Sequence, residues 1–274
     1  MISKPFIVVK QPLKIFLLRL QVSHLKHRRH MMHNLIKLIK GELQRLQKYN
    51  VTLISLIVTL IWVALLYFID DTDVFLMLLP LVIILDVTMM SIMYTGAVMY
   101  FEKSENTMLS ILVTPVSHKD IIISKIIANV IQQTISTLLV ILAFVLLKDI
   151  SVSWIIILLM MLSIGFHTLL GFVFTYTAKD FTTMLTNFMF VMIVFATPSI
   201  LVYVNVIQTN DLINYLLLMS PFEQATIMIS SVFTQTYDVM FFMCIVLMIT
   251  YFALMYRWYV LPKFSSYVQK GSGV

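Results

Sequence analysis

The chain has 274 residues, of which 60% are hydrophobic and only 12% are charged, and its mean hydropathy is +0.96. A typical soluble domain is about 45–50% apolar and about 25% charged. This composition excludes an ordinary soluble enzyme, a disordered protein and a nucleic-acid-binding tail, and it leaves an all-α polytopic membrane protein. The single cysteine, Cys244, excludes an intramolecular disulfide and a multi-cysteine metal site.

The first 30 residues form a basic segment that contains Pro5 and Pro12. This segment has no small-residue cleavage site, so we do not expect a signal peptide. The pair Met31-Met32 follows at once. We expect translation to start at one of these two methionines, with residues 1–30 as a start-site artefact or a disordered leader.

Residues 33–49 show a different pattern. Apolar residues recur at helical spacing, and basic or amide side chains fill the other positions. The apolar positions are Leu35, Ile36, Leu38, Ile39, Leu43 and Leu46. The pattern predicts a basic amphipathic helix that lies in the membrane interface.

Six later stretches are long and apolar enough for bilayer-spanning helices, which need about 20 such residues. They run from about Val51 to Ile69, Val74 to Tyr100, Ile121 to Lys148, Val152 to Thr177, Phe181 to Val206, and Val239 to Leu261. The segment 208–238 is too apolar for a free loop and too interrupted for a seventh span. The prediction is one six-span domain over residues 50–262, followed by a cytoplasmic tail at 263–274.

The distribution of charge predicts the orientation of these spans. Basic residues are dense before the first span, and they recur in the loop after the second span and near the C-terminus. Acidic residues, including Asp70, Asp71, Asp73 and Asp238, dominate the opposite side. By the positive-inside rule both termini are expected in the cytoplasm. The net charge of +6 is therefore attributed to topology and not to a nucleic-acid partner.

Four polar residues inside the predicted spans are candidates for a translocation path: Asp86, Gln132, Gln133 and His167. Asp86 is the only acid in mid-span. It either has a function or lies toward the outer half of a long span, where it pairs with a neighbour or faces water. His167 fits a helix–helix hydrogen bond better than a proton relay or a metal site. The two glutamines line either a path or an interhelical contact.

Several catalytic motifs are absent from the sequence. It contains no G-x-x-x-x-G-K-[ST] phosphate loop, no H-E-x-x-H and no G-x-S-x-G. The chain therefore shows no recognised means of hydrolysing ATP or a peptide. Two rival classes stay open, namely an intramembrane enzyme and an ATP-independent carrier or channel that uses Asp86.

The loop after the second span, residues 101–120, has the pattern of a stiff connector. Glu105 lies near the start of a short amphipathic segment, where its charge suits a helix dipole. Leu109 and Leu112 share a face, and Pro115 ends the segment. Ser117 is placed to cap the next helix. The pattern predicts a short surface helix that either docks a partner or simply joins two spans.

This loop resembles that of the membrane subunit of type-2 ABC exporters, the ABC-2 permease family, which has the form F-E-[RK]-E-x-G-T-x-x-x-L-L-x-T-P-x-S followed by a lysine. The matching residues are Glu102, Lys103, Glu105, Thr107, Leu112, Thr114, Pro115, Ser117 and Lys125. Asn106 and Ser124 stand where the family usually has glycine. Asparagine tolerates the left-handed conformation, so the first departure is mild.

The resemblance covers residues 32–262 and implies a fold with an interfacial N-terminal helix, six spans, a cytoplasmic coupling helix between spans 2 and 3, and a partly inserted outer segment between spans 5 and 6. It also implies a permease that exports a substrate across a bacterial cell membrane. The apolar, methionine-rich spans suit a hydrophobic or amphipathic drug, lipid or peptide, but exposure of the spans to lipid explains their composition equally well. The chain itself would be no enzyme and would bind no cofactor, because ATP is hydrolysed on a separate ABC ATPase subunit. A second permease, identical or related, would complete the path. The implied ATPase-coupling residues are Glu102, Glu105, Thr107, Met108, Leu109, Leu112, Pro115 and Lys125.

Overall fold

The structure is a computed structural model that describes residues 33–112, 116–208 and 210–270. The leader 1–30, the pair Met31-Met32 and Pro115 lie outside these ranges. Every regular element within them is helical. The elements are the N-terminal helix (His33–Lys48), α2 (Val51–Tyr67), α3 (Thr72–Leu85), η1 (Asp86–Met90), α4 (Ser91–Ser104), α5 (Thr107–Leu112), α6 (His118–Lys148), α7 (Ile155–Thr177), α8 (Phe181–Val191), η2 (Met192–Ala196), α9 (Thr197–Tyr203), α10 (Asp211–Leu218), α11 (Pro221–Thr234), α12 (Val239–Met255), η3 (Tyr256–Val260) and α13 (Leu261–Lys270).

Five continuous helical stretches of the described chain are long and apolar enough to cross a membrane, and seven if two bent pairs are counted as spans. The five are Thr72–Ser104, His118–Lys148, Ile155–Thr177, Phe181–Tyr203 and Val239–Gln269. The bent pairs are the N-terminal helix with α2, at 66°, and α10 with α11, at 99°. The predicted all-α, multi-pass architecture is confirmed, whereas the count of six spans is not fixed by helix length and composition.

Acidic and hydroxyl side chains define where several helices begin. Asp71 accepts hydrogen bonds from the backbone N–H groups at the start of α3, and Asp180 and Asp238 do the same for α8 and α12. Ser117 Oγ accepts from the Asp120 backbone N–H at 3.1 Å, so the predicted cap of α6 is confirmed. These caps satisfy backbone donors that the first turn of a helix leaves without partners.

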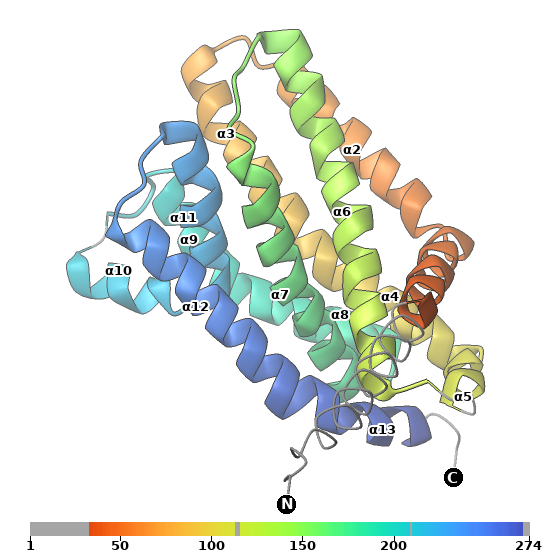
Figure 1. Cartoon of the computed structure of the whole chain (residues 1–274). Coiled ribbons are helices and arrows are strands. Elements are labelled where there is room, and N and C mark those ends of the chain that lie inside the picture. The colour runs from red at the N-terminus through yellow and green to blue at the C-terminus, as the bar shows by residue number, and fades with distance from the viewer. Residues whose placement is uncertain (1–32, 113–115, 209, 271–274) are drawn as a thin grey trace, which may run out of the picture.

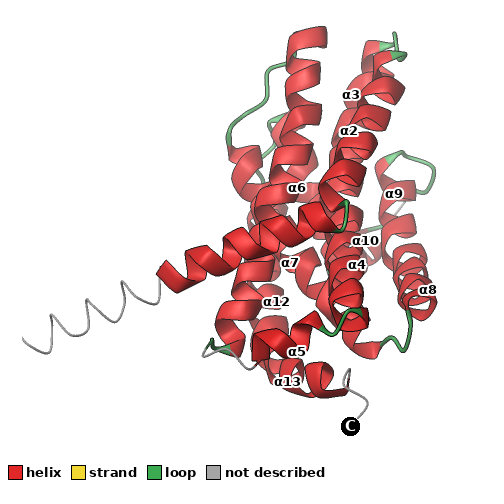
Figure 2. Cartoon of the chain, turned by 90° about the vertical axis from the view of Figure 1, so that its right-hand side faces the viewer, coloured by secondary structure: helices red, strands yellow, loops and turns green. Residues whose placement is uncertain are grey.

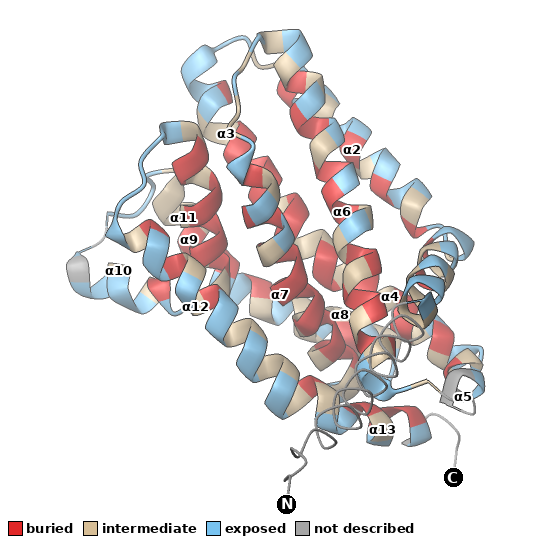
Figure 3. Cartoon of the chain, in the orientation of Figure 1, coloured by how far each residue is buried: buried red, intermediate tan, exposed pale blue. Residues whose placement is uncertain are grey.

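α7 is the central helix of the bundle, and it packs against α4, α6, α11 and α12 (Figure 1). Its inner face is buried, whereas α2 and α12 carry long exposed stripes (Figure 3). The contact between α7 and α4 is close because Gly171 has no side chain there. A Cβ atom at Gly171 would lie 2.7 Å from Thr95 Cβ and 2.9 Å from the Ile92 carbonyl oxygen. This glycine therefore sets the distance between the two helices.

One end of the bundle gathers short helices that do not run along it. α5 and α13 lie at this end, and the N-terminal helix crosses the upright helices above them (Figures 1 and 2). Met108 of α5 belongs to one buried apolar cluster with Phe264 and Tyr267 of α13. The segment expected as a tail is thus helical up to Lys270 and packs into the fold. Its amphipathic pattern, with three buried residues at Phe264, Tyr267 and Val268, explains this difference.

Candidate functional site

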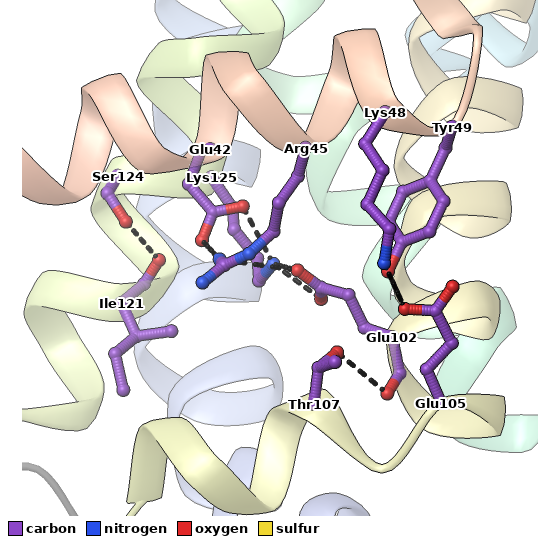
Figure 4. A network of polar contacts seen from close by, with 10 residues as sticks. All are labelled: Glu42, Arg45, Lys48, Tyr49, Glu102, Glu105, Thr107, Ile121, Ser124 and Lys125. Carbon is purple, nitrogen blue, oxygen red and sulfur yellow. Dashed lines mark hydrogen bonds and ion pairs between the residues drawn. The ribbon is translucent and has the colours of Figure 1, made fainter.

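Four charged side chains meet at this end, where the N-terminal helix, α4 and α6 converge (Figure 4). Lys125 Nζ donates to both carboxylate oxygens of Glu102 at 2.6 Å and to Glu42 Oε2 at 2.9 Å. Arg45 forms an ion pair with Glu42 and lies 3.4 Å from Glu102 Oε1. We call these four residues the charge cluster. Two carboxylates balance two cations, so the cluster carries no net charge.

The charge cluster is buried, since Glu102, Glu42 and Lys125 have 0%, 4% and 6% of their surface exposed. Charges removed from water in this way stay ionised only when they are paired and hydrogen-bonded. The pairing ties the N-terminal helix to α4 and α6 at one point. Glu102 and Lys125 are both among the coupling residues that the resemblance implies, and the structure brings them into contact.

Sequence reasoning did not find the partners of that pair on the N-terminal helix, Glu42 and Arg45. A signal was present, because Glu42 is the only acid in residues 33–49 and lies one turn from Leu38 and from Leu46 on the apolar stripe. An acid on the buried face of a basic amphipathic helix indicates a buried cation opposite it.

A second, exposed contact lies beside the charge cluster. Glu105 Oε2 accepts hydrogen bonds from Lys48 Nζ at 2.5 Å and from the Tyr49 hydroxyl at 2.9 Å. The Lys48 ammonium holds the pKa of the Glu105 carboxyl below its ordinary value. Because both side chains are well exposed, solvent screens this pair and it adds little to stability. Its role is to connect the start of the loop with the end of the N-terminal helix.

The short helix α5 is attached to the bundle by three local features. Thr107 Oγ1 donates to the Glu102 carbonyl oxygen at 3.1 Å. Met108 is 4% exposed and packs inside the chain, which leaves little of its surface for a partner protein. Asn106, between α4 and α5, adopts the left-handed conformation with φ of 56°. Leu109 and Leu112 belong to α5, but their side chains lie outside the described part of the structure.

The left-handed backbone at Asn106 leads to a prediction for the turn. Replacing Asn106 with Ala should lower the free energy of unfolding by about 1 kcal/mol, because a Cβ without a compensating polar group is disfavoured at positive φ. Replacing it with Gly should leave stability within about 0.5 kcal/mol. Thermal unfolding of the purified variants in the same detergent measures both effects. Equal melting temperatures for the two variants would contradict the prediction.

The polar residues inside the candidate spans fall into separate groups. Gln133 Nε2 donates to Asp86 Oδ2 at 2.7 Å and to the Asp86 carbonyl oxygen at 3.0 Å. The Thr137 hydroxyl donates to the same carboxylate oxygen at 2.6 Å. Gln132 lies on another face of α6 and accepts from Thr52 at 3.2 Å. The structure therefore joins Asp86 to Gln133, but not to Gln132.

α6 makes further polar contacts with α2 and with α7. Ser136 shares hydrogen bonds with Ser55 and Thr59 of α2. Asn129 donates to the Thr168 hydroxyl of α7 at 2.7 Å. Short polar side chains that pair across apolar helices stabilise helix–helix contacts in a membrane. The interpretation of the α6 glutamines as interhelical contacts thus has direct geometric support, and a path along them stays a prediction.

Asp86 keeps one feature that helix packing does not account for. It begins η1, a π-helical turn, and is 1% exposed. Its Oδ1 atom has no hydrogen-bond partner among the described residues, although the Trp62 indole interacts with the carboxyl group. A buried carboxylate oxygen without a donor is costly, so this position is constrained by more than a simple cross-link.

Substitution of Asp86 tests how much its carboxylate contributes to the stability of the fold. Asp86→Asn keeps the shape but weakens two charge-assisted hydrogen bonds, and we expect it to cost about 1–3 kcal/mol of unfolding free energy. Ser136→Ala, which removes neutral hydrogen bonds from α6 to Ser55 and Thr59 of α2, should cost about 1 kcal/mol or less. Thermal melting curves compare the two. Asp86→Asn at wild-type stability would make Asp86 a tolerated residue.

No group of three or more potential metal-ligating side chains occurs in the part of the chain that the structure describes. His167 shares no hydrogen bond with Asp86, because its Nδ1 is bonded to the Ser163 carbonyl oxygen of its own helix at 2.8 Å.

The chain matches no model of a known protein family, and no curated protein aligns with it significantly.

Proposed function

We propose that this chain is the permease subunit of an ABC-2 type exporter with six membrane spans and both termini in the cytoplasm. A separate ABC ATPase subunit would bind at α5, and a second permease would complete the path for a hydrophobic or amphipathic substrate. The proposal is supported by the loop residues from Glu102 to Ser117 that resemble the family's loop. It is also supported by the way in which α5 is joined to the bundle.

That attachment is the observation that carries the proposal. A partner bound to α5 would act on a helix of six residues, too short to bend. Displacement of α5 would reach Glu102 through the Thr107 hydrogen bond, and from Glu102 it would reach Lys125 on α6 and Glu42 on the N-terminal helix. Three helices would then move together. A segment that only joins two spans does not need a buried cluster of four charges next to it.

Two variants separate docking from force transmission. Leu112→Asp should abolish binding of the ATPase and ATP-driven export, because a buried apolar anchor commonly contributes about 1–3 kcal/mol or more to an interface. Glu105→Ala should leave docking intact and reduce export, because it removes only the link to Lys48 and Tyr49. Gln47→Asp, an exposed change on the N-terminal helix, should preserve both activities.

The measurements are co-purification of the ATPase from native membranes and ATP-dependent uptake of substrate by inside-out vesicles. Membrane insertion of each variant is checked by fractionation. If Leu112→Asp retains full docking and full export, the loop is only a connector and the exporter proposal loses its main support.

One observation favours a second candidate, an ATP-independent carrier that uses Asp86. A buried carboxylate with a free oxygen inside a π-helical turn is suited to binding a proton or a cation. This carrier would transport substrate in vesicles without ATP and would lose activity in Asp86→Asn. The exporter would require ATP in the same assay.

A further inference from the structure

A cavity of about 480 Å³ lies on the face of α7 between η2 and α12. Its size falls within the range of small-molecule sites, which is about 300–1,000 Å³. Nearly all of its lining is aliphatic or aromatic. The principal wall residues are Phe166, Leu170, Met192, Phe195, Phe222 and Tyr251.

The cavity opens between two candidate spans that hardly touch each other. η2 packs against α11, and α12 packs against α7 and α11, but no substantial contact joins η2 to α12. The rim residues Phe195 and Leu254 are 45% and 39% exposed. The two stretches that carry them, Phe181–Tyr203 and Val239–Gln269, are the least buried of the five candidate spans. An apolar molecule in the membrane therefore has a lateral route into the cavity.

His167 is the one strongly polar side chain on the wall, and it is 2% exposed. Its Nδ1 lies 2.8 Å from the Ser163 carbonyl oxygen, which can only accept, so Nδ1 carries the proton. In the neutral ring Nε2 is then an acceptor, and no described residue donates to it. Apart from His167, the polar side chains among the lining residues are Tyr251 and Tyr259, and the rest of the wall is apolar.

Two of the three π-helical turns of the described chain border this cavity. Met192, Phe195 and Ala196 belong to η2, and Tyr259 belongs to η3. Ile92 follows η1 after one residue and also lines the wall. π-helical turns are rare and occur frequently at functional sites, because they turn side chains away from regular helical positions. Their convergence indicates that the space is a maintained feature of the fold.

We propose that the cavity binds an apolar molecule with a single hydrogen-bond donor, of the alkylphenol or hydroxyl-lipid class. Its hydroxyl donates to His167 Nε2, and its hydrocarbon part fills the space between Phe166, Phe195 and Phe222. The site does not depend on an ATPase partner, so binding is expected in the isolated chain and stands apart from the proposed export activity.

The test uses the full chain in lipid nanodiscs and a 4-alkylphenol that carries a photoactivatable diazirine. Labelled positions are found by mass spectrometry of the peptides. We expect labelling in the segments 191–196 and 251–259 that line the cavity. The competitors are 4-nonylphenol and 4-nonylanisole, which differ only in the hydroxyl donor. The phenol should compete about 3- to 10-fold better, as one hydrogen bond predicts.

Two variants and one control complete the experiment. His167→Phe keeps an aromatic ring without an acceptor and should remove the preference for the phenol, whereas Leu170→Trp should fill the cavity and abolish labelling. His118→Phe, at an exposed histidine on α6, should behave as wild type. Labelling spread evenly over lipid-facing residues, or equal competition by phenol and anisole in the wild-type chain, would overturn the proposal. The comparison of competitors needs no variant and holds even if His167→Phe fails to fold.

Discussion

Lys125→Met should lower the free energy of unfolding by about 3–5 kcal/mol, the cost of leaving buried carboxylates without their cation. Lys125 is the partner of both Glu102 and Glu42, and its removal leaves two acids facing Arg45 alone. The expected result is a large fall in melting temperature together with detachment of the N-terminal helix from α4 and α6. Thermal melting in detergent and protease sensitivity near residue 49 measure the two effects.

The matched control is Lys48→Met, which removes a cation from the same end of the bundle. Lys48 pairs with Glu105 at the surface, where solvent screens the charges, so its loss should leave the melting temperature close to that of the wild type. The double variant Lys125→Met with Glu102→Gln should be more stable than Lys125→Met alone, because Glu42 and Arg45 then remain as a balanced pair. If Lys125→Met and Lys48→Met melt at the same temperature, the charge cluster does not anchor these helices.

Gly171→Ala should be the most damaging methyl addition in the bundle, at about 1–3 kcal/mol or more. The added Cβ would meet Thr95 Cβ at 2.7 Å and the Ile92 carbonyl oxygen at 2.9 Å. A backbone oxygen cannot rotate aside, so α4 has to move away from α7. Loss of the close contact should lower the melting temperature. It should also reduce the proposed export, because α4 ends at the charge cluster.

Two other glycines provide controls for this result. Gly96 faces the flexible Met184 side chain at 2.7 Å, so Gly96→Ala should cost less than Gly171→Ala. Gly41, in the N-terminal helix, has no atom within 4 Å of its Cβ position, and Gly41→Ala should stabilise the protein by about 0.5–1 kcal/mol through helix propensity. A similar effect for Gly171→Ala and Gly41→Ala would contradict the importance of the α4–α7 distance.

Sequence pattern was sufficient for the helices themselves, because apolar runs of this length leave few alternatives. It also located the cap at Ser117, since a cap depends on neighbouring residues only. It missed the join between Glu102, Lys125 and the N-terminal helix, because Glu42 lies 60 residues before Glu102 and its pairing depends on how helices pack. It also gave the tail after Lys263 no structure, because α13 is amphipathic and too polar for a span.

The surroundings of His167 also depend on how the helices pack, which the sequence pattern does not show. The sequence made His167 one of four candidates for a path and favoured for it a hydrogen bond to another helix, yet its Nδ1 bonds to Ser163 of its own helix and its ring borders an apolar cavity. Spacing along α7 identifies the face on which a residue lies, but not which helices leave a gap over that face. The cavity arises because η2 and α12 stay apart, which no local pattern encodes.

The spacing of the two lysines on α6 relates the fold to the thickness of its bilayer. Lys125 and Lys148 are 23 residues apart on one continuous helix, which corresponds to about 35 Å along its axis and about 32 Å at an average tilt. This matches a hydrocarbon core of about 30 Å. Lys148 is fixed at its end by a hydrogen bond to the Ile69 carbonyl oxygen, and Lys125 is fixed by the charge cluster. A thicker membrane would draw one of these charges into hydrocarbon, so we expect lipid chain length to act directly on the stability of the cluster.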